Sequence, residues 1–198
     1  GLEFLPAAVA HESGWRGDDG QFQNGKGKAD VGLGIAYDVN SELSAEATIN
    51  PDFSQVEADE EQIDVNSTFA LFYTEKRPFF QEGSDLFNTY FNAVYTRSIN
   101  DPLVAGKLTW RRGSSSLAFL TARDEHSPIT LPFEESSEFL ENGKSYSNIL
   151  RLKHDLGKQS HVGLLATNRI FDGGGMGSLA SVDGQIRLST SNSFRFQA

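Results

Sequence analysis

Residues 43–50 read LSAEATIN, and this short stretch sets the fold class. Apolar and polar side chains alternate along it one by one, and the apolar set is Leu43, Ala45, Ala47 and Ile49. Successive side chains of a β-strand point to opposite faces of the sheet, so strict alternation indicates a strand with one apolar and one polar face. The same stretch therefore predicts both the secondary structure and an orientation that the structure can test.

The alternation recurs in both directions from this stretch. It is found in DVGLGIAYDV (30–39), VAGKLTWRR (104–112), SYSNILRLKHDL (145–156), HVGLLATNRIF (161–171) and SVDGQIRLST (181–190). Turn-like sequences separate the strands at 38–42, 111–116 and 155–160, and longer polar loops are expected at 14–28, 124–144 and 172–177. No helical period is sustained over a comparable length. The chain is therefore predicted to be all-β, an antiparallel up-and-down meander.

Composition narrows the classes of function. Seventeen basic and 27 acidic residues give a net charge of −10, which argues against a basic stripe that binds nucleic acid. There is no cysteine, so disulfides and thiolate sites are excluded within the chain. No run of apolar residues is long enough for a transmembrane helix.

Two architectures are consistent with strands of this kind. A soluble sandwich buries the apolar faces in a core, whereas an outer-membrane-type β-barrel turns them toward lipid. Strands of roughly 10 residues and the alternation of short turns with long loops favour the barrel, here a partial one. The direction of the apolar set of residues 43–50 separates the two: outward in a barrel, into a core in a sandwich.

An irregular segment interrupts the meander at about 51–88. It contains an acidic cluster from Asp52 to Asp64 and then EKRPFFQEG at 75–83, where Pro78 breaks any regular strand. We expect the segment to fold inward as a plug or constriction, because it carries charges of both signs that can pair with each other or with the strand walls. The residues expected in this lumenal element are Asp52, Glu57, Asp59, Glu75, Lys76, Arg77, Phe79, Phe80, Glu82 and Arg97.

Other functions remain open for the same residues. Glu75 and Glu82, or the carboxylates of the Asp52–Asp64 cluster, are candidates for the acid and base of a glycan hydrolase. Oxygen ligands from Asp52, Glu57 and Asp59 are candidates for a Ca²⁺ site, although no EF-hand spacing is present, and no other cofactor is expected. A second alternative is a soluble carbohydrate-binding β-sandwich, for which Trp15 and Trp110 are the only aromatic seeds.

Three blocks in this region carry a resemblance to a known family. They read TINPDFSQVEAD (48–59), LFYTEKRPFFQEG (71–83) and VYTRSI (94–99). In this order and spacing they resemble DUF5916, a bacterial family of unknown function in which a β-barrel-like region follows a carbohydrate-binding-module-9-like domain. The resemblance covers the chain from about residue 29 onward.

The resemblance implies a location in the outer membrane of a Gram-negative-type bacterium, in contact with its lipid. Family members are often labelled as membrane-associated hydrolases, but that label is tied to no catalytic residue in this chain. We therefore expect a noncatalytic role in transport, or in membrane anchoring of a protein that handles glycans or polymers. Residues 1–198 would form a single region, the N-terminal part of a larger barrel, with any glycan bound by a module that precedes residue 1.

Overall fold

The computed structural model describes residues 1–198 except 13, 17–19, 26, 52–74, 76, 100, 133–136 and 142. The side chains of residues 11, 15, 28, 97, 128–132 and 137–141 are also outside the description. Asp52, Glu57, Asp59 and Lys76, all expected in the plug, therefore lie outside the described residues.

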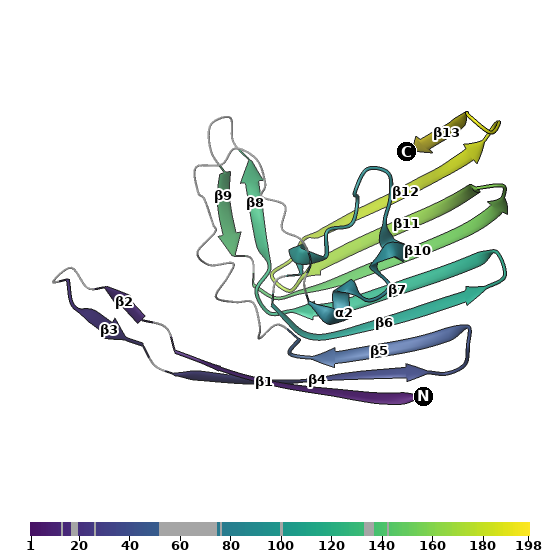
Figure 1. The fold of residues 1–198 in the computed structure, drawn as a ribbon. Helices are drawn as coiled ribbons and strands as arrows, with labels where there is room; N and C mark the ends of the chain where they lie inside the picture. The colour runs from purple at the N-terminus through teal and green to yellow at the C-terminus, as the bar shows by residue number, and fades with distance from the viewer. Residues whose placement is uncertain are drawn as a thin grey trace.

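Nine strands form one antiparallel sheet, and Figure 1 shows them side by side from β1 at one edge to β13 at the other. Their bounds are β1 Leu2–His11, β4 Lys28–Asp38, β5 Leu43–Ile49, β6 Pro102–Arg112, β7 Ser115–Asp124, β10 Ser145–Gly157, β11 Ser160–Phe171, β12 Met176–Arg187 and β13 Ser193–Gln197. Neighbours in this sheet follow one another along the chain, so the predicted all-β antiparallel meander is confirmed. The sheet is open, with β1 and β13 as its edges, and closure into a barrel stays a prediction.

The two ends of the sheet differ. Short turns join β4 to β5, β6 to β7, β10 to β11 and β12 to β13 at one end. At the opposite end lie the hairpin of β2 (Gly14–Arg16) and β3 (Phe22–Asn24), and the hairpin of β8 (Pro128–Pro132) and β9 (Ser137–Glu141). The loops expected at 14–28 and 124–144 thus contain paired strands, and the third expected loop is a short turn between Phe171 and Met176.

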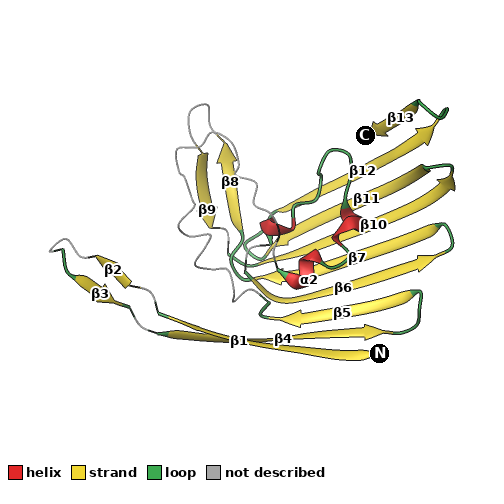
Figure 2. Cartoon of the chain, in the orientation of Figure 1, coloured by secondary structure: helices red, strands yellow, loops and turns green. Residues whose placement is uncertain are grey.

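The described residues between 75 and 99 are largely irregular and lie on one face of the sheet (Figure 2). These residues, 75 and 77–99, are named here the covering segment, and Figure 2 shows its short helices against the strands. These are α2 (Pro78–Gln81), η1 (Ser84–Phe87) and η2 (Thr96–Ser98). Pro78 begins α2, where a missing N–H costs nothing, and Gly83 follows the helix in the left-handed region with φ 65°. Within the described residues, no helix is long and apolar enough to cross a bilayer.

A small hydrophobic core lies between the covering segment and the sheet. The segment contributes Phe80, Leu86, Phe87 and Ile99. The sheet contributes three alanines, Ala105, Ala118 and Ala122, and three larger side chains, those of Leu120, Ile149 and Leu165. Because alanine stands low above the strands, the aromatic rings of the segment can approach the sheet closely.

The two faces of the sheet have the reverse of the usual polarity. On β5, Thr48 is 5% exposed and faces the covering segment, whereas its neighbour Ile49 is 52% exposed on the other side. We call these sides the covered face and the apolar face. The strand register places further exposed side chains on the apolar face: Tyr37, Leu108, Phe119, Leu152, Leu164, Val182 and Phe194. In residues 43–50, Ala47 and Ile49 are exposed on the apolar face, and Leu43 and Ala45 are half-buried there.

Candidate functional site

Arg77 organises the covering segment and is 1% exposed. Its Nε and Nη2 atoms donate to the two carboxylate oxygens of Glu75, each at 2.8 Å. Nη1 donates to the main-chain oxygen of Ile99 at 2.7 Å, and Nη2 also donates to that of Thr96 at 3.0 Å. The guanidinium carbon lies 4.1 Å from the centre of the Phe80 ring. One buried cation thus ties the first described residues of the segment to its last ones.

The carboxylate of Glu75 is held by the same cluster. Besides the guanidinium, it accepts the backbone N–H of Arg77 at 3.1 Å and the hydroxyl of Thr96 at 2.6 Å. Burial on its own raises the pKa of Glu75, but hydrogen bonds from Arg77 and Thr96 outweigh that effect and hold the pKa below its usual value. Both oxygens of this side chain are therefore occupied, and it is ionised at neutral pH.

Lys107 on β6 connects the sheet to α2. Its side chain is buried, and Nζ donates to the main-chain oxygens of Phe79 at 2.8 Å and Glu82 at 2.6 Å. The counter-ion is Glu46 on β5, whose Oε2 lies 2.8 Å from Nζ. Carbonyl groups at a helix C-terminus lack intrahelical partners, so a cation placed there satisfies them. Lys107 therefore anchors the end of α2 to the sheet.

Two further strands hold the rest of the covering segment. Arg169 on β11 donates from Nη2 to the main-chain oxygen of Ser98 at 2.6 Å, and from Nε to Ser147 of β10 at 2.9 Å. Gln197 on β13 accepts the backbone N–H of Phe91 at 2.6 Å. The segment thus contacts the sheet from β6 to β13 across the covered face.

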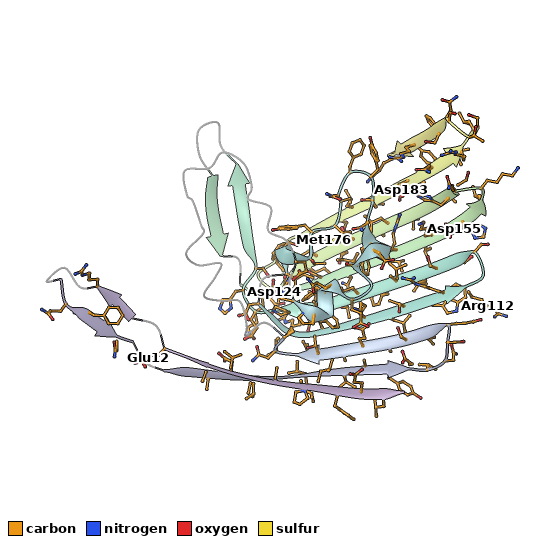
Figure 3. All side chains as sticks on the ribbon, viewed as in Figure 1. Glu12, Arg112, Asp124, Asp155, Met176 and Asp183 are labelled. Carbon is orange, nitrogen blue, oxygen red and sulfur yellow. The ribbon has the colours of Figure 1, made fainter. Side chains whose placement is uncertain are left out.

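The covered face also carries an ion pair within the sheet itself. Arg151 on β10 reaches over β11 to Asp183 on β12, with bonds from both terminal nitrogens, one of them 2.8 Å long. Figure 3 labels Asp183 on β12. The intervening residue is Gly163, where a Cβ atom would lie 2.6 Å from Nη1 of Arg151. A glycine at this position is what lets the pair form across three strands.

The residues expected in the plug that are described all lie in the covering segment, but their neighbours differ. Glu75, Arg77 and Phe80 form one cluster, and Phe79 lies 5.0 Å from Nζ of Lys107. Glu82 lines an open groove between the end of α2 and the turn that joins β4 to β5. Arg97 lies in η2, and its side chain is not described.

Chemistry at these carboxylates is restricted by their contacts. Glu75 is fully engaged by Arg77 and Thr96, while the groove beside Glu82 is lined by other carboxylates, those of Asp38, Glu42 and Glu46. No group of three acidic or histidine side chains converges into a metal site among the described residues. The Ca²⁺ candidates Asp52, Glu57 and Asp59 lie outside that part of the chain.

Sequence reasoning did not single out the residues of the sheet that hold the segment. They are Glu46, Lys107, Arg151, Arg169 and Asp183. Each occupies a polar position of an alternating strand, and such a position is ordinarily solvent-exposed. Alternation alone gave no signal for them, because a core, a lipid phase and a lumen all produce the same period of two.

These observations define the class of the protein. It is an antiparallel meander with an exposed apolar face and a charged face that a segment of the chain covers. Residues 2–107 match the family described as "Domain of unknown function (DUF5916)". This match spans more than half of the 198 residues, so the chain belongs to that family, as the sequence blocks predicted, and the match begins before residue 29. No curated protein and no solved structure matches the chain.

Proposed function

We propose that this chain is part of the wall of an outer-membrane β-barrel. In this proposal the apolar face contacts lipid, and the covered face looks into a polar lumen. The reversed polarity of the two faces carries the proposal. In water, exposed Ile49, Phe119 and Val182 would form a large apolar patch, whereas in a bilayer they are favourably placed.

Strand length supports the proposal independently. A tilted strand needs about 9–11 residues to cross the hydrocarbon region. β4 and β6 have 11 residues each, and β10 has 13. Strands of ordinary globular sheets are about half as long. The length therefore fits a bilayer better than the core of a small soluble domain.

The covering segment gives this barrel wall a role. It lies on the face assigned to the lumen, where Lys107, Arg169 and Gln197 hold it. A segment fixed there narrows the passage, so the proposed role is transport through a constricted lumen. A barrel that anchors a glycan- or polymer-handling protein in the membrane is the alternative role for the same wall.

A hydrolase at Glu75 finds no support in the geometry. A catalytic carboxylate must reach its substrate, and a pair of carboxylates flanking a glycosidic bond must face a common cleft. Both oxygens of Glu75 instead accept hydrogen bonds from Arg77 and Thr96. Hydrolysis at Glu75 is therefore not proposed.

Trp110 provides the test, because it lies on the apolar side of β6, opposite Leu43 and Leu117 in the register. The chain has two tryptophans, so Trp15→Phe leaves Trp110 as the single tryptophan, which can be excited selectively over the tyrosines. In vesicles of lipids with brominated acyl chains, we expect strong quenching of its fluorescence. The protein should also need detergent for extraction and migrate differently in gels before and after heating.

The matched control moves the fluorophore to the other face. Lys153 is a half-buried residue of β10 with the parity of the covered face, so Lys153→Trp combined with Trp15→Phe and Trp110→Phe should resist quenching. Equal quenching at both positions, or a monodisperse protein in plain buffer with unquenched Trp110, would overturn the proposal.

A further inference from the structure

A row of four polar side chains crosses the apolar face. The register aligns Thr121 of β7 with Asn148 of β10, Asn148 with Asn168 of β11, and Asn168 with Ser178 of β12. We call these four residues the polar row. It lies inside the apolar surface: Leu150 and Ala166 flank it on one side, and Ile170 and Met176 on the other.

The hydrogen bonds inside the polar row leave part of it unused. Thr121 donates its hydroxyl to Oδ1 of Asn148 at 2.9 Å, and Asn168 donates Nδ2 to the hydroxyl of Ser178 at 2.9 Å. Among the described residues, Nδ2 of Asn148 and Oδ1 of Asn168 have no hydrogen-bond partner. Both side chains are half-buried, so they remain accessible from outside the sheet.

Contact with lipid is energetically unfavourable for these two amide groups. Each hydrogen-bonding group without a partner in hydrocarbon costs several kcal/mol, so polar side chains on a membrane face tend to meet other polar groups. Within the proposed barrel wall, another protein surface must therefore supply a donor for Asn168 and an acceptor for Asn148.

The row itself carries both of the required groups. A donor on Asn148 and an acceptor on Asn168 lie on neighbouring strands at one level of the sheet. Consider a two-fold axis that lies in the plane of contact and passes between β10 and β11. It would place Asn148 of one copy opposite Asn168 of the second copy, and Asn168 of the first opposite Asn148 of the second. A surface with this property is self-complementary, which is the requirement of a symmetric dimer.

We propose that a second copy of this chain covers the polar row, forming a two-fold dimer within the membrane through reciprocal Asn148–Asn168 hydrogen bonds. This inference rests on the proposed function, because it takes the apolar face to be in lipid. It adds a partner to that face and a site at which the partner binds. The surrounding side chains, Leu150 and Leu164 among them, would pack in the same contact.

The absence of cysteine makes the test direct. In the full chain, Ala166→Cys places a single thiol beside the polar row, and Val31→Cys places one on the same face of β4, four strands away from β10. In vesicles, a short bis-maleimide should cross-link the Ala166→Cys variant into a dimer and leave the Val31→Cys variant monomeric, because the spacing of two facing sheets exceeds the reach of a disulfide. The cross-linked fraction should persist as the protein is diluted with lipid.

The second arm removes the amides. Asn148→Leu with Asn168→Leu keeps the side-chain size but loses two interchain hydrogen bonds, so Förster transfer between labelled copies should show about tenfold weaker dimerisation. Val31→Leu is the matched control and should leave the dimer unchanged. Transfer at the level of random encounters, or undiminished transfer after the double substitution, would overturn the dimer.

The two proposals fail differently. If Trp110 is quenched by brominated lipid but the Ala166→Cys variant does not cross-link, the proposed barrel wall is supported, and lipid rather than a second copy covers the polar row. If Trp110 is not quenched, the wall itself fails. The variant with both asparagines replaced by leucine should insert into vesicles at least as well as the native chain, because it replaces polar groups on a lipid-facing surface with apolar ones.

Discussion

Arg77 shows at the scale of one residue how the covering segment tolerates a buried charge. Removing a cation from water costs several kcal/mol unless an anion and further hydrogen bonds replace the solvent. Here the carboxylate of Glu75 and the main-chain oxygens of Thr96 and Ile99 do so. The Phe80 ring covers one side of the guanidinium. The cluster therefore holds the two ends of the described segment together through contacts within the segment itself, without help from the sheet.

The depressed pKa of Glu75 gives a prediction for pH dependence. A carboxyl group with a lower pKa in the folded state contributes stability above its unfolded pKa of about 4.3, and that contribution is lost as the pH falls from there through the lower pKa of the folded state. We expect the segment of the native chain to loosen on acidification in this range. Hydrogen exchange of the backbone N–H of Arg77 and of the amides of α2, measured from pH 6 to pH 3, should report it.

Glu75→Gln should remove this pH dependence and lower stability at neutral pH, because the guanidinium of Arg77 then loses its ion pair with the carboxylate of Glu75. Glu82→Gln is the control, since Glu82 lies at the open groove and its carboxylate has no bond to Arg77. An acid transition that survives in the Glu75→Gln variant would show that other groups cause it.

The sequence placed the important residues of the segment but not their roles. Glu75 and Glu82 attract attention as a carboxylate pair, because both flank the same aromatic run. Residue type and spacing cannot show that Arg77, only two positions from Glu75, folds back to bind both of its oxygens. That depends on the backbone path around Pro78, which is a tertiary property.

At the scale of elements, the covering segment and the sheet meet through a small hydrophobic core and a set of polar anchors. Lys107 is central, because it binds two carbonyl groups at the end of α2 and one carboxylate of the neighbouring strand. An anchor of this kind holds the segment at one end of a helix and leaves the strand pairing untouched. Segment and sheet can therefore be perturbed separately.

Lys107→Met combined with Glu46→Leu should release the segment while the sheet stays folded. The double change avoids leaving the half-buried carboxylate of Glu46 without its counter-ion. We expect faster hydrogen exchange at Gln81 and Glu82 and a higher conductance in planar bilayers, because the proposed constriction opens.

Arg111→Met is the control for Lys107. Arg111 pairs with Asp85 of η1 at 3.3 Å, but both side chains are more than half exposed, so the loss should stay below about 1 kcal/mol. Unchanged exchange and conductance in the Lys107 and Glu46 double variant would contradict the anchoring role.

The strands were predictable where the alternation of apolar and polar residues was strict. They were less predictable at the end of the sheet where the two additional hairpins lie. The hairpins β2–β3 and β8–β9 lie in stretches that read as polar loops. Their strands have only 3 and 5 residues, too few for a periodic signal. The turn between β11 and β12 was expected to be long because it is rich in glycine, yet glycine also permits the positive φ of Gly174 and Gly175 in a tight connection.

At the scale of the whole molecule, the two faces of the sheet are the property that alternation alone could not assign. Period two predicts an apolar and a polar face, but a core, a lipid phase and a lumen all produce the same period. The position of the covering segment breaks this symmetry, since it lies on the side of Thr48 and Lys107. Closure of the sheet depends on edges β1 and β13, which no local pattern describes.

The assignment of the apolar face to lipid leads to a last prediction, for Leu164. This residue is exposed at the middle of β11, between Leu152 and Val182 in the register. If the face contacts the bilayer, Leu164→Arg should destabilise the protein folded in vesicles by about 2–4 kcal/mol, which is the cost of a cation near the bilayer midplane. Urea titration in vesicles measures that difference.

Leu188→Arg, in the exposed turn after β12, is the control and should change the stability by at most about 0.5 kcal/mol. If the apolar face met water instead, Leu164→Arg would increase solubility without loss of stability, and the assignment of that face to lipid would be wrong.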